Sequence, residues 1–499
     1  MSALVPLPVV LPILGAALAI VGGRSRDFQR MISLLTLGTV LVVSIALLVE
    51  ADDTGLVIHQ EGGWPAPLGI TLVADRFATL MLVVSAVVLL AVLVYAIGQR
   101  GEEDERVSFH PLYLVLAAGV AGSFLTADLF NLFVSFEMML AASYVLITLG
   151  GRPDQVRSGM SYVVISLVAS TLFITVLALL YAATGTVNMA DLSGRIDELD
   201  PGVQAAFAIT LLVVFGIKAG LFPLFFWLPD SYPTAPGPVT AIFAGLLTKV
   251  GVYAIIRTQT LLFGMPDWMG TVLIVVAILT MVVGVLGAIS QDDMKRILAF
   301  HIISQIGYMI FGLGLFTVAG LAGAIFYIVH HILVKTTLFL VAGLVDQRAG
   351  SSRLSEVGGL VRTEPIIAVL FALPALSLAG IPPFSGFIAK FTLVEAGLGD
   401  RAWWGVAFAL AVGLLTLYSM TKIWSGVFWG ARDEEPRNAP MALGRLGGSV
   451  PTVLATAALA LTSLAVIVWA SPLYEVAERA SLDLIDPRRY VDAVLGAAP

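Results

Sequence analysis

Long apolar runs separated by short polar loops fill nearly the whole chain. A helix of roughly 20 apolar residues crosses a bilayer core of about 30 Å. Because backbone polar groups inside lipid must be paired within the segment, helices are the only structure expected for such runs. The strict alternation typical of a membrane β-barrel is absent. The pattern predicts fourteen spanning helices near residues 4–22, 31–49, 72–98, 111–125, 128–149, 159–184, 204–227, 236–257, 269–289, 297–316, 322–344, 365–396, 403–428 and 450–470.

Both ends of the chain are predicted to lie on the outer side of the cytoplasmic membrane of a prokaryote. Cytoplasmic loops of membrane proteins carry an excess of Lys and Arg. One set of alternate loops holds most of the loop cations, among them Arg24, Arg26, Lys295 and Arg296, and this set is placed in the cytoplasm. The first apolar run has no basic segment before it, so it is interpreted as a spanning helix rather than a cleaved signal.

The sequence carries a weak internal repeat. Segment 137–150 aligns with 301–314, and three further segment pairs follow in the same order at similar spacing. Each unit holds five spans, so the second copy enters the membrane upside down, as in many secondary transporters. We predict an all-α polytopic membrane protein with two inverted five-helix repeats, each with a broken helix. The predicted division is helices 1–3 (1–110), the first repeat with helices 4–8 (111–260), the second repeat with helices 9–13 (265–430), and helix 14 with the tail (431–499).

The composition limits the chemistry that the chain can support. Hydrophobic residues make up 59% of the chain and charged residues 12%, against roughly a half and a quarter in soluble domains. The chain has no cysteine, which excludes disulfides, thiolate nucleophiles and cysteine-ligated metal clusters. No phosphate loop, nucleophile elbow or metal motif occurs. These absences argue against an enzyme, and no cofactor is expected.

Lysine is concentrated inside the predicted spans. A charge at a helix centre costs about 2.5–3.5 kcal/mol, so five would cost on the order of 12–17 kcal/mol. That cost rivals the roughly 5–15 kcal/mol net stability of a typical protein, which argues against accident. A buried lysine can gain and lose a proton, whereas arginine stays charged. Of the six lysines only Lys295 lies in a loop, and the others are Lys218, Lys249, Lys335, Lys390 and Lys422.

Other titratable residues share these spans. Glu137 is the one acid deep within a span and is the natural counter-charge for Lys218. In the repeat alignment His301 occupies the position of Glu137. His331 lies four residues before Lys335, on the same helix face. Histidine changes charge near neutral pH, so a string of such groups near the midplane indicates a proton or ion relay.

Structural explanations compete with this interpretation. Lys422 could reach the cytoplasmic end of its span, and His301, near the start of a span, could be interfacial. Buried Glu and Lys residues could also form purely structural ion pairs. His330 and His331 could bind a metal, but adjacent histidines point to different faces and no carboxylate completes a site. We keep His301, His330 and Lys422 as possible further relay residues and expect no metal.

Prolines interrupt two of the predicted spans at matched positions of the repeat. Pro223 lies in the seventh span, and Pro374, Gly380, Pro382 and Pro383 lie in the twelfth. Proline removes a backbone donor and kinks a helix. The freed carbonyls can hold water or cations where they line a protected cavity. A packing kink is the alternative, but the paired position favours a functional break.

Four segments of the chain resemble the D subunit of the Mrp-type multisubunit cation/proton antiporters, and the resemblance runs through nearly the whole sequence. The wider superfamily includes the antiporter-like subunits of respiratory complex I, which share the pattern of Glu and Lys. The stretches "EGGWPAPLGI" and "FEMMLAASYVLITLGG" favour the Mrp-type family. The four segments are "EGGWPAPLGITLVADRFATLML" (61–82), "TADLFNLFVSFEMMLAASYVLITLGG" (126–151), "GIKAGLFPLFFWLPDSYPTAPGPVTAIFAGLLTKVGVYAIIRT" (216–258) and "LSLAGIPPFSGFIAKF" (376–391).

The resemblance implies roles for individual residues. In the family, an essential acid lies on the fifth span and a lysine lies at the break of the seventh. An eighth-span lysine links two half-channels, a relay lies on the eleventh span, and a terminal lysine lies on the twelfth. In this sequence the corresponding positions are, in that order, Glu137, Lys218, Lys249, His331 with Lys335, and Lys390.

The activity implied is exchange of external protons for internal sodium or a similar monovalent cation, without a redox cofactor. Protons would pass along the midplane from Lys218 to Lys390, and Glu137 would stabilise protonated Lys218. The expected partners are other subunits of a membrane antiporter complex and the lipid bilayer, with no nucleic acid. Two alternatives stay open: a proton-pumping subunit of a complex I or membrane-bound hydrogenase type redox complex, and a scaffold subunit with an inactive channel.

Overall fold

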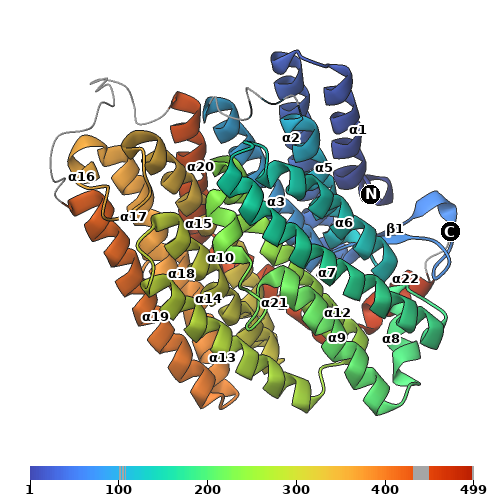
Figure 1. The fold of residues 1–499 in the computed structure, drawn as a ribbon. Coiled ribbons are helices and arrows are strands. Elements are labelled where there is room, and N and C mark those ends of the chain that lie inside the picture. Colours follow the sequence, from blue (N-terminus) through green and yellow to red (C-terminus); the bar gives the residue numbers. More distant parts are fainter. Residues whose placement is uncertain (100–102, 104–105, 107, 431–448, 497–499) are drawn as a thin grey trace.

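The computed structural model describes residues 1–99, 103, 106, 108–430 and 449–496, which are almost entirely helical (Figure 1). Twelve helices within these ranges are long and apolar enough to cross a membrane. They are η1–α1 (Ser2–Val21), α2 (Arg26–Thr54), α3 (Arg76–Gln99), α6 (Leu129–Ile147), α7 (Pro153–Thr184), α9 (Pro201–Ala219), α11–α12 (Gly237–Phe263), α13 (Asp267–Ile289), α14 (Met294–Leu315), α15 (Val318–Ala349), α19–η5 (Trp403–Trp429) and α20 (Val450–Val468).

Two shorter apolar helices lie where the pattern also predicted spans. They are α5 (Phe109–Leu125) and α17 (Pro365–Ala379), and α18 (Ser385–Gly399) continues the chain beyond the end of α17. The count of fourteen spans therefore stays a prediction. The remaining described helices are η2 (Glu61–Gly63), α8 (Met189–Asp197), α10 (Leu228–Ser231), η3 (Tyr232–Thr234), α16 (Leu360–Thr363), α21 (Ala470–Ile485) and α22 (Arg488–Gly496).

Two parts of the structure differ from the purely helical prediction. Strand β1 (Leu56–Gln60) pairs antiparallel with β2 (Thr71–Asp75), where a loop and the start of a span were predicted. Both strands contain β-branched residues that suit a pleated surface, and the hairpin joins α2 to α3. Beyond α20, α21 and α22 were not predicted, because they are amphipathic rather than uniformly apolar.

Three long helices form the enclosed centre of the protein. An apolar stretch of 18 residues is 100% buried inside the protein in α11–α12 and in α15, and the stretch in α14 is 94% buried. The corresponding share is only 39% in α7, α13 and α19, whose other faces are left for lipid. A helix that is apolar all round belongs in the interior. The central position of α12, α14 and α15 decides where their polar residues lie.

The predicted breaks in the seventh and twelfth spans are present, and they share one geometry. α9 ends at Gly220 with φ +79° and α17 ends at Gly380 with φ +87°, a left-handed backbone that glycine adopts without a Cβ clash. At the first break the N–H groups of Gly220 and Leu221 both donate to the carbonyl of Gly216. At the second, the N–H groups of Gly380 and Ile381 both donate to the carbonyl of Leu376.

All the prolines assigned to the two breaks, except Pro374, lie beyond these glycines in the chain. Pro223 lies between α9 and α10, and Pro382 and Pro383 lie between α17 and α18. Pro374 was also placed among the breaks, but α17 continues through it to Ala379. The break follows the left-handed glycine, and proline inside the helix does not end it.

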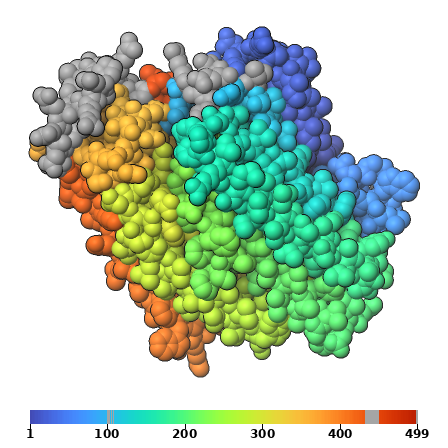
Figure 2. All heavy atoms as spheres, viewed as in Figure 1, coloured from blue at the N-terminus to red at the C-terminus, as the bar shows by residue number. Residues whose placement is uncertain are grey.

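Across the face seen in the figures, early helices lie at one edge and late helices at the other. Figures 1 and 2 show α1 and α2 at one edge, α6 to α9 next to them, and α17 to α19 at the opposite edge. The central helix α15 packs against α3, α14, α17, α18 and α20. Helices from both halves of the sequence therefore enclose the helix that carries His330, His331 and Lys335.

Candidate functional site

Lys218 lies on the last turn of α9, immediately before the break. Its side chain is buried, and its Nζ donates to the hydroxyl of Ser170 at 3.1 Å and to the carbonyl of Ser166 at 3.2 Å. The Ser170 hydroxyl in turn donates to the carboxylate of Glu137. Glu137 and Lys218 are thus joined through a serine hydroxyl rather than by a direct ion pair.

Lys249 follows a π-helical segment, η4 (Phe243–Leu247), in the helix pair α11–α12. The wider π turn loosens the regular i to i−4 hydrogen bonding. Lys249 Nζ donates to the carbonyl of Ala244 at 2.6 Å and to the hydroxyl of Thr248 at 3.1 Å. The lysine is fully buried, and both of these acceptors come from its own helix pair.

Two glycines bring the lysine-bearing helices together. A Cβ on Gly251 would lie 2.7 Å from the backbone nitrogen of Ala219, next to Lys218. A Cβ on Gly245 would lie 2.1 Å from the hydroxyl oxygen of Thr336, next to Lys335. These close approaches bring α12 against α9 and the π-helical segment η4 against α15.

His331 and Lys335 lie on α15, as predicted, and both are fully buried. Neither ring nitrogen of His331 has a hydrogen-bond partner among the described residues, and the ammonium nitrogen of Lys335 has none there either. The Lys335 Nζ lies 6.0 Å from the ring centre of Phe339. Burying such groups without partners is unfavourable, and structures that retain them often use them functionally.

The other two intramembrane histidines are each held by a serine. His330 Nδ1 lies 2.9 Å from the hydroxyl of Ser385, at the start of α18. His301 Nε2 on α14 lies 2.8 Å from the hydroxyl of Ser419 on α19. Both side chains are buried inside the protein. His330 therefore connects α15 to the second break.

Lys390 lies on α18 and reaches back to the end of α17. Its Nζ donates to the carbonyls of Leu378 and Ala379 at 3.0 and 3.1 Å and lies 5.2 Å from the ring centre of Tyr308. The last carbonyls of a helix have no partner within the helix and carry partial negative charge. The carbonyls freed at the break thus bind the Lys390 ammonium group. They stabilise its charge in place of an acidic side chain.

Lys422 lies apart from these groups. Its Nζ donates to the carbonyls of Ile289 and Gln291 at the end of α13, at 3.1 and 2.5 Å. This arrangement matches a lysine that reaches the end of its span. As for metals, the described ranges contain no cluster of three or more His, Cys, Asp or Glu side chains that could hold an ion.

Several polar residues of the site were missed by the sequence reasoning. Ser166 and Ser170 lie four residues apart in α7 and face Lys218, but single serines in an apolar run give little signal. Arg257 of α12 was also missed. It is buried and pairs with Asp75 of β2 at 2.6 Å, and the end of β2 was hidden inside a predicted span.

Comparisons with known proteins agree with this architecture. Residues 126–416 match the family described as NADH:quinone oxidoreductase/Mrp antiporter, transmembrane. The chain is 46% identical over 497 residues to the D subunit of the Na(+)/H(+) antiporter of Alkalihalophilus pseudofirmus, covering 99% of this chain and 100% of that protein. It is 39% identical to the D subunit of the Na(+)/H(+) antiporter of Bacillus subtilis over 99% of this chain and 100% of that protein.

Two solved structures extend the comparison to the fold. A chain of the Mrp complex from Dietzia sp. DQ12-45-1b superimposes with a TM-score of 0.91 at 34% identity, covering 99% of this chain and 100% of that one. A chain of the membrane-bound sulfane sulfur reductase, an archaeal respiratory membrane complex, gives a TM-score of 0.86 at 27% identity, with 99% of each chain covered. The protein therefore belongs to the NADH:quinone oxidoreductase/Mrp antiporter transmembrane family, among relatives named as the D subunits of Na(+)/H(+) antiporters.

Proposed function

We propose that this chain is the proton-translocating subunit of a multisubunit Na+/H+ antiporter. Its relatives are named as subunits of such antiporters, and a chain of an Mrp complex shares its fold over the full length. Protons move along the midplane through Lys218, Lys249, His331, Lys335 and Lys390. The other antiporter subunits are its partners, and export of sodium or a similar cation is coupled to this movement.

One observation carries the proposal: buried titratable groups lie on helices that pack one against the next across the protein. Lys218 at the end of α9 lies beside Gly251 of α12, and Gly245 of η4 lies beside Thr336 of α15. His330 on α15 reaches the first residue of α18, the helix of Lys390. Buried ionisable residues in membrane helices commonly mark ion pathways, so this series supports a proton route.

Glu137 is proposed as the group that controls entry into the route. It is half-buried and bonded to Ser170, which also binds Lys218. A charge that acts on Glu137, such as a cation in a neighbouring subunit, would change the stabilisation of protonated Lys218. His301 and His330 are proposed as supporting groups, and Lys422 stays a prediction as a relay residue.

The membrane arrangement is part of the proposal. We propose fourteen spans, with α5 and α17 added to the twelve long helices, and both termini outside the cytoplasm. Two inverted repeats over 111–260 and 265–430, flanked by 1–110 and 431–499, are supported by the matched hydrogen bonding at Gly220 and Gly380. Of the last region, residues 431–448 and 497–499 lie outside the described residues.

The proposal is tested by replacing Glu137 with Ala in the intact complex. Sodium-dependent proton movement in inside-out vesicles should be abolished, while the amount of assembled complex stays at its normal level. Glu198→Ala, which removes an exposed acid at the end of α8, should leave exchange unchanged. Near-normal exchange in the Glu137→Ala complex would refute the proposed function.

A redox-driven proton pump is the second candidate. The specific observation in its favour is the 27% identity and full-length overlap with a chain of an archaeal respiratory complex. Purification of the native complex separates the two candidates. Co-purifying chains that carry iron–sulfur or other redox centres would favour the pump, and partners confined to antiporter subunits would favour exchange.

A further inference from the structure

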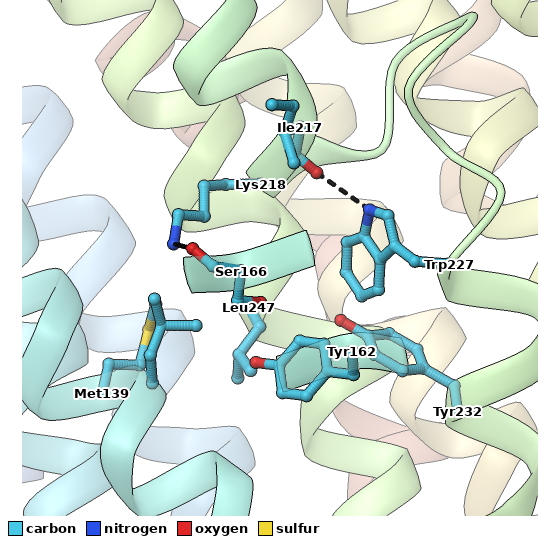
Figure 3. Close-up of a pocket in the computed structure, with 9 residues that line it drawn as sticks. Met139, Tyr162, Ser166, Ile217, Lys218, Trp227, Tyr232 and Leu247 are labelled. Atoms are coloured by element: carbon cyan, nitrogen blue, oxygen red, sulfur yellow. Dashed lines mark hydrogen bonds between the residues drawn. The ribbon is translucent and has the colours of Figure 1, made fainter. Parts of the chain in front are cut away.

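A small, mostly apolar cavity lies against Lys218, lined by residues of α6, α7, α9, η3 and η4 and by Trp227 at the start of α10 (Figure 3). It leaves about 10 Å³ for the centre of a water molecule, which is roughly the space that one buried water needs. Its polar lining comes from Tyr162, Ser166, Lys218 and Tyr232. Figure 3 shows Lys218 and Ser166 on one side of the group and the rings of Tyr162 and Tyr232 on the other.

The hydroxyl of Tyr232 gives independent evidence for a ligand in this cavity. The side chain is fully buried, and its hydroxyl has no hydrogen-bond partner among the described residues. Tyr162, by contrast, shares a hydrogen bond of 2.8 Å with Ser143. A buried hydroxyl without a partner is unfavourable, and a water with two to four polar partners commonly satisfies such groups.

The cavity lies on a polar row that runs along α7. Ser158, Tyr162, Ser166 and Ser170 follow one another at intervals of four residues, which places them along one ridge of the helix. The row spans about 18 Å at 1.5 Å per residue. Its far end reaches the start of α7, where the carbonyl of Ser158 accepts a hydrogen bond from Ser231 at 3.2 Å.

Three members of the row contact polar groups of the site or of the break. Ser170 binds Glu137 and Lys218, Ser166 binds Lys218 through its carbonyl, and Ser158 binds the residue before Tyr232. The opposite side of α7 is exposed and apolar, with Val164, Leu167 and Val168 between 48% and 51% exposed. The polar row therefore faces the interior, between the Pro153 end of α7 and Lys218.

At the second break a larger cavity of about 460 Å³ lies against Lys390, Gly380 and Tyr308, but the tyrosines there are arranged differently. Tyr308 and Tyr327 occupy the repeat positions of Tyr144 and Tyr162 and stack with ring centres 5.3 Å apart. Their hydroxyls are both satisfied by protein, one by the carbonyl of Ala409 at 2.6 Å and the other by Gln305. The tyrosine hydroxyls at the second break therefore need no water, whereas the buried His330 Nε2 and Gln305 Nε2 there have no partner among the described residues.

We propose that the cavity binds one water molecule and that Tyr232, this water and the α7 row form a proton path between Lys218 and the Pro153 end of α7. The inference rests on the proposed function, in which Lys218 is a proton site. The water accepts a proton from one of its two neighbours, the Lys218 amine or the Tyr232 hydroxyl, and donates one to the other. One proton crosses the cavity for each transfer, and no bond between heavy atoms forms or breaks.

The transport test removes one hydroxyl at a time from the intact complex. Tyr232→Phe should lower exchange by at least about tenfold, since positioned proton-transfer groups contribute roughly 10²–10⁴ in rate. Proton transfer through the cavity should also become limiting, so the ratio of rates in H2O and D2O should rise. Tyr113→Phe is the matched control, because its hydroxyl is equally buried but donates to the carbonyl of Leu89 and does not line the cavity.

A direct test of the water keeps the inference falsifiable if Tyr232→Phe fails to assemble. In X-ray radiolytic labelling of the wild-type complex, a water bound beside Tyr232 should cause rapid hydroxylation there and little at Tyr113. Absence of labelling at Tyr232, or wild-type rates and isotope ratio in Tyr232→Phe, overturns the inference. Lys218→Ala distinguishes the two proposals: exchange retained in that variant refutes the proposed function, whereas exchange lost there but normal in Tyr232→Phe refutes only the path through Tyr232.

Discussion

Ser170 is the group that connects Glu137 and Lys218 in the structure. Its hydroxyl donates to the Glu137 carboxylate and accepts from Lys218 Nζ at 3.1 Å. Ser170→Ala removes both hydrogen bonds and leaves the two charged groups in place. If Glu137 acts on Lys218 through this hydroxyl, the substitution should uncouple them without removing either titratable group.

The size of the effect follows from the bonds that are lost. A hydrogen bond to a charged group contributes about 1.5–3 kcal/mol, and each 1.4 kcal/mol is a factor of about ten. Weakening the coupling by one such bond predicts a fall in exchange of about 10- to 100-fold. The other contact of Lys218, to the Ser166 carbonyl, is unaffected because it involves the backbone.

The assay is sodium-dependent proton movement in inside-out vesicles, normalised to the assembled complex. Thr171→Ala is the control: it removes a hydroxyl from the next residue of α7, on the exposed face, where the bond is to the carbonyl of Leu167. Ser170→Thr keeps the hydroxyl and should retain most activity. A wild-type rate in Ser170→Ala would refute the reasoning, and so would a Glu137→Gln/Ser170→Ala variant much slower than Glu137→Gln alone.

Three further predictions concern buried groups elsewhere. Lys335→Met should abolish exchange but raise the unfolding temperature of the complex, because it removes a buried ammonium that has no partner among the described residues; a lowered temperature would contradict this. Asp75→Asn should destabilise the complex by about 3–5 kcal/mol, since it leaves Arg257 buried without its carboxylate, and thermal unfolding measures the loss. Gly245→Ala should cost about 1–3 kcal/mol and slow exchange, because its Cβ would overlap Thr336 and separate η4 from α15; unchanged stability and exchange would show that the contact yields without effect.

The sequence predicts the helices because, in a membrane, the length of an apolar run is enough to identify a helix. Apolar runs of sufficient length can only be helical in lipid, so the predicted spans match the described helices to within a few residues at most ends. The hairpin of β1 and β2 escaped detection because its second strand, Thr71–Asp75, was included in the predicted span 72–98, although the charged pair Asp75 and Arg76 separates it from the apolar run of α3. Local composition cannot reveal a pairing between strands that are separated by a loop.

The charged residues of the site were predictable, and the groups that connect them were not. Lysine inside an apolar run stands out because it is costly there, and the same reasoning identified Glu137 and the histidines. Ser170 and Tyr232 carry no such cost in the sequence, since serine and tyrosine are common in membrane helices. Their importance comes from three-dimensional contacts: Ser170 lies between two charges, and the Tyr232 side chain lines a cavity beside Lys218.

The two broken helices stabilise their buried lysines in different ways. This difference decides at which end of the proposed route an outside charge can act. Lys390 receives its stabilisation from the two carbonyls at the end of α17, which are fixed dipoles that no neighbouring subunit can change without unfolding the helix end. Lys218 also lies at a helix end, but it is connected to a half-buried carboxylate through a hydroxyl that can rotate. A charge outside the chain can therefore alter the proton affinity of Lys218 through Glu137, whereas at Lys390 it meets backbone dipoles. In the proposed route, coupling to a cation is thus exerted at the Glu137 end, and Lys390 passes on protons that the first unit has released.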